Sequence, residues 1–133
     1  MLSNPFNWSG KTVLIAEDDA LSRKLMGLYL TPTGVKILWA TTGAEALELI
    51  QEHTQTDLAV LDIQMPLVNG FDVARFLKRN HSHIPIIIQT AYALPEYRKL
   101  CCEIGCDDYI TKPFEKKKLL ESIQKQLTEV AVY

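Results

Sequence analysis

Short, almost wholly apolar runs alternate along this sequence with longer segments whose apolar residues recur at helical spacing. Runs that stay apolar throughout are typical of parallel strands that helices cover on both faces. The runs are Thr12–Ala16, Val35–Ala40, Leu58–Leu61, Ile84–Thr90 and Tyr109–Ile110. The alternation predicts an α/β fold in which five parallel strands alternate with five helices.

Residues that favour helix ends lie between these runs. Thr42 and Glu45 form a capping-box pattern, and Asn69 is a favourable N-cap for the following helix. Pro95 suits the first turn of a fourth helix, and Gly105 suits its end. Short connections and right-handed crossovers favour a doubly wound sheet with strand order 2-1-3-4-5, in which ligands bind at the carboxyl ends of the strands.

Polar side chains stand at the carboxyl ends of four predicted strands. They are Glu17, Asp18 and Asp19 after the first strand, Asp62 after the third, Thr90 at the end of the fourth and Lys112 after the fifth. Each of these residues alone is more often a helix cap, a satisfied hydroxyl or a surface lysine. Because the carboxyl ends of parallel strands meet at one rim, the set as a whole predicts a phosphoryl-transfer site.

The side-chain types define the chemistry of this predicted site. Two or three carboxylates suit Mg²⁺, which also relieves the repulsion between them. An ionised Asp62 can attack phosphorus in line and become an acyl phosphate. Lys112 and Mg²⁺ can hold the transferring oxygens while Thr90 donates a hydrogen bond.

Charge and composition limit the classes of partner. The 133-residue chain has 14 basic and 16 acidic residues and a net charge of -2, so we expect no direct contact with nucleic acid or membrane. We predict no signal peptide and no membrane span, and therefore a cytoplasmic location.

We expect residues 1–10, with Trp8, to be a linker and residues 11–130 to form the domain. Cys101, Cys102 and Cys106 are expected to be reduced helix residues, because an odd, clustered set fits neither a disulfide framework nor a zinc site.

Four segments resemble the receiver domains of two-component response regulators. They are VLIAEDD at residues 13–19, LAVLDIQMPLVNG at 58–70, IIIQTAYA at 86–93 and DDYITKPF at 107–114. The resemblance extends over residues 11–128 and implies a flavodoxin-like doubly wound fold. It also implies that Asp62 accepts a phosphoryl group from a phosphohistidine, with Mg²⁺ as cofactor.

The resemblance also implies roles for the residues around Asp62. Asp18 and Asp62 would ligate Mg²⁺ directly and Glu17 through water, because Glu17 stands where the family more often has Asp. The backbone carbonyl of Gln64 would complete the protein ligands. The implied switch residues are Thr90 as the hydroxyl and Tyr109 as the aromatic ring, and Lys112 would precede a cis proline. The residues that influence hydrolysis of the acyl phosphate would be Gln64 and Tyr92.

The segment NWSGKTVLIAEDD is similar to the join into the receiver of a hybrid sensor histidine kinase. The implied partners are a histidine kinase domain and a histidine phosphotransfer protein. A homodimer through the fourth helix, fifth strand and fifth helix is a further expectation. The domain itself would phosphorylate and dephosphorylate itself, whereas kinase activity would belong to the parent protein.

Three alternatives remain open at this point. The chain can be a stand-alone response regulator instead of part of a hybrid kinase. A hydrolase with an aspartyl-phosphate intermediate usually has a second acid two residues after the nucleophile, where this sequence has Gln64. A flavin-binding domain of the same topology needs a phosphate-binding loop after the first strand, where Glu17, Asp18 and Asp19 would repel phosphate.

Overall fold

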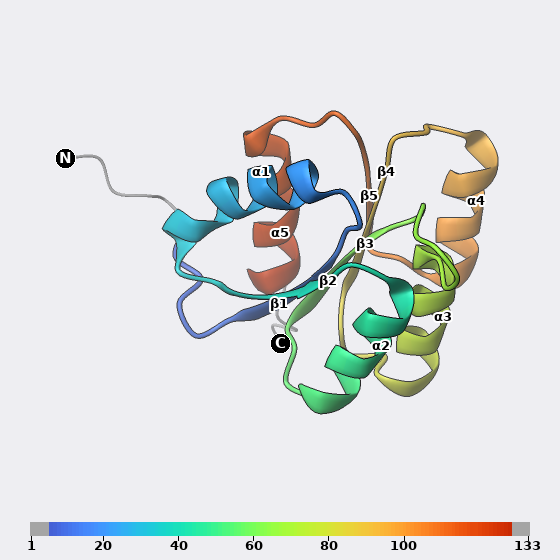
Figure 1. The fold of residues 1–133 in the computed structure, drawn as a ribbon, viewed down its shortest axis with the longest axis horizontal. Coiled ribbons are helices and arrows are strands. Elements are labelled where there is room, and N and C mark those ends of the chain that lie inside the picture. Colours follow the sequence, from blue (N-terminus) through green and yellow to red (C-terminus); the bar gives the residue numbers. More distant parts are fainter. Residues whose placement is uncertain (1–5, 129–133) are drawn as a thin grey trace, which may run out of the picture.

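The computed structural model describes residues 6–128, which form five strands, five α-helices and one short 3-10 helix, η1 (Figure 1). In chain order the elements are β1 (Thr12–Ala16), α1 (Ala20–Leu30), η1 (Thr31–Thr33), β2 (Lys36–Ala40), α2 (Gly43–Glu52), β3 (Leu58–Asp62), α3 (Gly70–Asn80), β4 (Ile86–Thr90), α4 (Pro95–Ile104), β5 (Asp108–Thr111) and α5 (Lys116–Thr128). The predicted alternation of strands and helices is confirmed.

The strands form one parallel sheet in the order β2-β1-β3-β4-β5, as the sequence predicted. Ala16 at the end of β1 pairs with Leu61, and Asp62 at the end of β3 pairs with Gln89. The direction in which strands are added reverses at β1, so the crevice of this doubly wound sheet lies at the carboxyl ends of β1 and β3. The register therefore brings the acidic ends of these two strands side by side.

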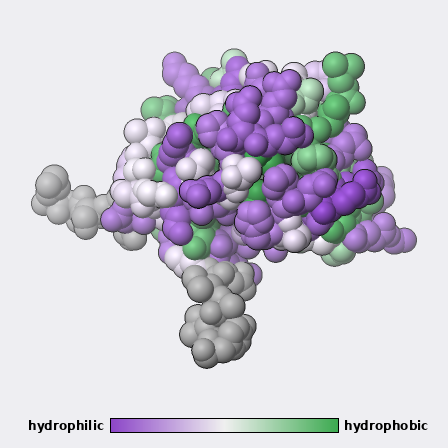
Figure 2. Space-filling model, turned by 90° about the horizontal axis from the view of Figure 1, so that it is seen from below, coloured by the Kyte–Doolittle hydropathy of each residue, from purple (hydrophilic) through white to green (hydrophobic). Residues whose placement is uncertain are grey.

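Helices cover both faces of the sheet (Figure 1). Helices α2, α3 and α4 pack on one face, and α1 and α5 pack on the other. Every residue of β3 and β4 is buried, which explains why these strands are apolar runs rather than alternating patterns. Seen from below, the outer surface is mainly hydrophilic and its hydrophobic areas are separate (Figure 2).

The helix ends follow the predicted signals with one exception. The Thr42 side chain accepts a hydrogen bond from the Glu45 amide, but the Glu45 carboxylate accepts from the amide of Thr41 rather than from that of Thr42. Asn69 caps α3 in a complete capping box with Asp72. Gly105 ends α4 with a φ of 93°, in the left-handed region that favours glycine.

Strand boundaries differ from the prediction by one or two residues. The fourth strand begins at Ile86 instead of Ile84, because Pro85 has no N–H group for the strand ladder. The third strand includes Asp62, and the fifth extends from Asp108 to Thr111.

The prediction that Trp8 belongs to a linker is wrong. Its side chain is only 3% exposed and packs in the core between the sheet, α1 and α5. The indole N–H donates a hydrogen bond to Gln124 of α5, and the Trp8 amide donates to the carbonyl of Thr33 at 2.7 Å. Phe6 stacks on the indole with ring centroids 5.5 Å apart, so the packed domain begins before residue 11.

Candidate functional site

Three carboxylates meet at the carboxyl ends of β1 and β3. One oxygen from each of Glu17, Asp18 and Asp62 lies within 4.8 Å of the others. Glu17 and Asp62 are buried, whereas Asp18 is exposed. The structure thus brings together the three side chains that the sequence proposed as metal ligands, and three hard oxygen donors at one open edge suit a small divalent cation such as Mg²⁺.

The ammonium group of Lys112, which follows β5, enters this cluster. Its Nζ lies 2.9 Å from Oδ2 of Asp62 and also donates a hydrogen bond to Glu17. Burial raises the pKa of Glu17 to about 7, although the hydrogen bond from Lys112 acts to lower it. Burial alone would lower the pKa of Lys112, but hydrogen bonds to Glu17 and Asp62 raise it above its ordinary value. Lys112 therefore stays charged and compensates for the acids.

Asp19 has a different role from its two acidic neighbours. It is the N-cap of α1 and accepts a hydrogen bond from the amide of Ser22 at 2.8 Å, which lowers its pKa. Its own amide donates to Glu17 Oε2 at 3.0 Å. The first turn of α1 thereby fixes the orientation of the buried Glu17 carboxylate.

The acceptor side chain is held by the loop that follows β3. Oδ1 of Asp62 accepts the amide of Gln64 at 3.0 Å, while Lys112 contacts its other oxygen. Gly70 begins α3 directly against this turn: a Cβ there would lie 2.3 Å from the Asp62 carbonyl oxygen. No role was predicted for Gly70, although the Asn-Gly pair after the strand signals a turn at this point.

Gln64, in the loop after β3, connects Thr90 with α4. The buried Thr90 hydroxyl donates to the Gln64 side-chain carbonyl at 3.3 Å, and the Gln64 amide group donates to the Tyr97 hydroxyl at 3.3 Å. Tyr97 in turn packs edge-on against Phe71 of α3, with centroids 5.7 Å apart. The sequence predicted that the Gln64 backbone carbonyl binds the metal and that Gln64 influences hydrolysis of the acyl phosphate, but this side-chain bridge was not predicted.

Tyr109 of β5 lies inward in this structure. The residue is 9% exposed, and its hydroxyl donates to the Tyr92 carbonyl at 2.9 Å. The guanidinium of Arg98 in α4 lies 4.7 Å from the centre of the Tyr109 ring. The amide of Tyr92 donates to the Thr90 hydroxyl at 3.1 Å, so Thr90 and Tyr109 hold the same short loop.

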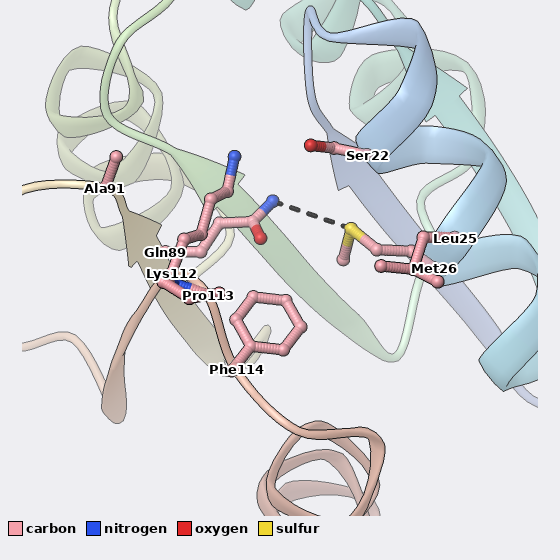
Figure 3. Close-up of a pocket in the computed structure, with 8 residues that line it drawn as sticks. All are labelled: Ser22, Leu25, Met26, Gln89, Ala91, Lys112, Pro113 and Phe114. Atoms are coloured by element: carbon pink, nitrogen blue, oxygen red, sulfur yellow. Dashed lines mark hydrogen bonds between the residues drawn. The ribbon is translucent and has the colours of Figure 1, made fainter.

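A cavity of about 380 Å³ opens beside Lys112, between α1 and the β5–α5 connection (Figure 3). It is lined by Ser22, Leu25, Met26, Gln89, Ala91, Lys112, Pro113 and Phe114. The Gln89 amide group donates to Glu17 at 3.4 Å and contacts the Met26 sulfur at 3.8 Å. Its buried carbonyl oxygen has no hydrogen-bond partner among the described residues. The polar Gln89 within an apolar run was a signal that the sequence analysis left unused.

Comparison with known proteins identifies the family. The response regulator receiver domain family matches residues 13–124 of this chain. The polar-differentiation response regulator DivK of Brucella ovis is 36% identical over 119 residues, which are 88% of this chain and 96% of DivK. The chain therefore belongs to the response regulator receiver domain family.

Solved structures agree with this assignment. A CheY-like response regulator receiver domain protein from Methanospirillum hungatei has a TM-score of 0.84 at 30% identity, over 90% of this chain and 94% of its own. The receiver domain of a signal transduction histidine kinase from Syntrophus aciditrophicus has a TM-score of 0.82 at 28% identity, over 93% and 95%. Within residues 6–128, none of the helices has the length and apolar character needed to span a bilayer.

Proposed function

We propose that this receiver domain accepts a phosphoryl group from a phosphohistidine onto Asp62 in a Mg²⁺-dependent reaction. The observation that carries the proposal is the contact of 2.9 Å between Lys112 Nζ and Asp62 Oδ2 inside the group of three carboxylates. Asp62 is 4% exposed and fixed by Gln64 and Lys112, so one oxygen is oriented before a donor arrives. Phosphoryl transfer depends mainly on such positioning and on charge neutralisation.

The donor set supports a magnesium site. Asp18 and Asp62 would bind the cation directly, the Gln64 carbonyl would add a third protein ligand, and Glu17 would act through water. When bound, Mg²⁺ supplies positive charge that offsets the carboxylates and the phosphoryl oxygens. In the transfer, a bond forms between an Asp62 oxygen and phosphorus as the bond from phosphorus to the histidine nitrogen breaks. Lys112 binds a phosphoryl oxygen in this step, and Thr90 donates to another.

The signal follows from competition for the Thr90 hydroxyl. Its weak bond to Gln64, at 3.3 Å, gives way when a charged phosphoryl oxygen is within reach, because hydrogen bonds to ionised acceptors are stronger. Gln64 then loses its contact with Thr90, which orients the side chain that also bonds to Tyr97 of α4. Phosphorylation thereby shifts the population of packing arrangements of α4, β5 and α5, with Tyr109 as the second switch residue.

The surface beside the site supports docking of a phosphohistidine-bearing protein. Leu21, Leu25 and Leu28 recur at helical spacing on α1 and are 75%, 45% and 64% exposed. An exposed apolar stripe next to a reactive site is typical of a protein-binding surface. We infer that a histidine kinase domain or a histidine phosphotransfer protein docks there. The surface of α4, β5 and α5 then remains available to a downstream partner or to a second copy of the domain in a homodimer.

For the parent protein, we propose a cytoplasmic receiver of a hybrid histidine kinase. The likeness to the receiver of the Syntrophus kinase supports this context, and the high coverage of DivK supports a stand-alone regulator as the alternative. Phosphotransfer assays with separate kinase and phosphotransfer domains distinguish these contexts, because a hybrid receiver passes its phosphoryl group on to a phosphotransfer histidine.

Incubation with acetyl phosphate and Mg²⁺ tests the acceptor assignment. Intact mass should increase by one phosphoryl group, and hydroxylamine should remove the label because it cleaves acyl phosphates. Asp62→Asn or a chelator should abolish labelling. Equal labelling of Asp62→Asn would refute the assignment.

A further inference from the structure

Two cysteines face each other where α4 ends and the chain turns toward β5. Gly105 adopts the left-handed conformation, and the amides of Gly105 and Cys106 both donate to the Cys101 carbonyl, at 2.9 and 3.0 Å. This closure turns the chain back on the last helical turn. It places Cys106, which was predicted to lie on the helix, next to Cys101 across the end of α4.

The two thiols interact directly. The Cys106 thiol donates a hydrogen bond to the Cys101 sulfur, which lowers the pKa of Cys101, while burial opposes this change and the charge of Arg98 favours it. The same contact is the main cause of a raised pKa at Cys106. In a helix end closed in this way, the side chains on either side of the left-handed residue commonly pack against each other. Both cysteines also line one cavity, and a disulfide requires such proximity. Cys101 is thus the thiol of the pair that loses its proton more readily, and Cys106 is the one that keeps it.

A small oxidant can reach this pair. A cavity of about 210 Å³ is lined by both thiols and by Arg98, Cys102 and Tyr109, among others. Cys101 is 4% exposed and Cys106 is half-buried, so the cavity, rather than an open surface, provides the route. Cys102 is exposed, and it points about 100° further around the helix than Cys101.

We propose that Cys101 and Cys106 form a reversible disulfide when a hydroperoxide oxidises Cys101. The Cys101 thiolate attacks one peroxide oxygen, the O–O bond breaks, and the leaving hydroxide takes a proton to become water. The sulfur is thereby oxidised to a sulfenic acid. The Cys106 sulfur then attacks the Cys101 sulfur and expels the hydroxyl group as a second water, with the Cys106 proton. In sum, two thiols and one hydrogen peroxide give one disulfide and two waters.

The disulfide would join the last turn of α4 to the chain that leads into β5. Two residues of α4 interact with Tyr109. The Arg98 guanidinium lies 4.7 Å from the centre of the Tyr109 ring. Burial raises the pKa of the Tyr109 hydroxyl, and the neighbouring Cys101 sulfur raises it further. Oxidation therefore acts on the segment between Cys101 and Tyr109. The chemistry itself needs neither Asp62 nor magnesium.

Treatment of the reduced protein with a small excess of hydrogen peroxide tests the proposal. Intact mass should fall by two hydrogen atoms, peptide mapping should join Cys101 to Cys106, and dithiothreitol should restore the original mass. Cys102→Ser is the matched control and should form the link at the same rate. Asp62→Asn should also form it, so failure of the phospho-acceptor assignment and failure of this proposal are separate results.

Variants of the pair give the second readout. In Cys106→Ser, the sulfenic acid at Cys101 should persist and react with dimedone, whereas Cys101→Ser should give no dimedone adduct at Cys106. Far-UV circular dichroism checks that both variants fold. The mass measurement on the wild-type protein does not depend on either variant. An unchanged mass, or a link that includes Cys102, would overturn the proposal.

Discussion

Lys112 Nζ lies 2.9 Å from Asp62 Oδ2, although 50 residues separate them in the sequence, and the same ammonium group bonds to Glu17. One cation thus satisfies two buried carboxylates, one directly after β1 and one at the end of β3. In the absence of metal, the positive charge of Lys112 offsets the repulsion between the carboxylates of Glu17 and Asp62. In the proposed phosphorylation of Asp62, the phosphoryl oxygens would compete with both carboxylates for Lys112.

Replacing Lys112 by Ala should slow phosphorylation of Asp62 by acetyl phosphate about 10²-fold, because it removes a positioned charge that acts on the transferring oxygens. Intact-mass time courses at saturating Mg²⁺ provide the rate. Lys117→Ala, on the exposed side of α5, is the matched control and should label like the parent. A Lys112→Ala rate equal to that of the control would exclude Lys112 from the reaction.

Glu17 predicts how the stability of the metal-free protein depends on pH. Folding raises its pKa from 4.5 to about 7, so the folded state binds the proton more tightly, and this contribution to stability is lost as the pH rises through about 7. Glu17→Gln should therefore raise the free energy of unfolding by roughly 1–3 kcal/mol at about pH 8, and the difference should vanish below about pH 4.5. Urea denaturation at several pH values measures this.

The exposed Glu52→Gln is the control for Glu17 and should show no such pH dependence. Mg²⁺ should stabilise the parent more than Glu17→Gln, because the cation binds the ionised acids. If Glu17→Gln raises the free energy of unfolding by the same amount at low pH, burial of the Glu17 charge is not the cause of the stabilisation.

Gly70→Ala should destabilise the fold by roughly 1–3 kcal/mol, because its Cβ would meet the Asp62 carbonyl oxygen at 2.3 Å. The shift of β3 against α3 should also slow labelling of Asp62. Gly27→Ala is the matched control in α1: its Cβ would lie 3.6 Å from the Trp39 ring, an ordinary contact. This variant should gain up to about 1 kcal/mol. Thermal and urea unfolding decide between these outcomes, and equal effects of both substitutions would contradict the steric argument.

Thr90→Ala should slow labelling of Asp62 much less than Lys112→Ala does, because it removes a neutral hydrogen-bond donor rather than a charge, but it should weaken the response of α4. The reason is that Thr90 is connected to Tyr97 of α4 through the Gln64 side chain. Hydrogen exchange of the α4 amides, with and without acetyl phosphate, measures the response. Thr90→Ser keeps the hydroxyl and should behave like the parent. If Thr90→Ala shows the parental change in exchange, the signal leaves the site by another route.

Tyr92→Ala should shorten the lifetime of phosphorylated Asp62. Tyr92 is 54% exposed beside the site, where its ring can cover the acyl phosphate and exclude water. Loss of the phosphoryl mass after removal of acetyl phosphate gives the rate. Tyr92→Phe retains the ring and serves as the control, so identical lifetimes for the Ala and Phe variants would rule out shielding.

Periodicity was enough to predict the strands and helices, because burial on both faces leaves a strong apolar signal. The rules of short connections and right-handed crossovers then predicted the sheet order and the meeting of Glu17, Asp62 and Lys112 at one rim. Interactions through the side chains of single residues were not predictable in this way. The Gln64 bridge depends on the position of Tyr97 in space, and the burial of Trp8 depends on the way α1 and α5 pack on the sheet. Neither has a periodic signal in the sequence.

The contacts of Trp8 fix where the chain enters the domain. Its amide bonds to Thr33, which precedes β2, and its indole bonds to Gln124 in the last turns of α5. Both partners lie at the amino-terminal edge of the sheet, opposite Asp62, because helices α1 and α5 run antiparallel to the strands. A fluorescent reporter or an immobilising tether attached near residue 6 or residue 128 would therefore leave the acceptor rim open to a donor protein.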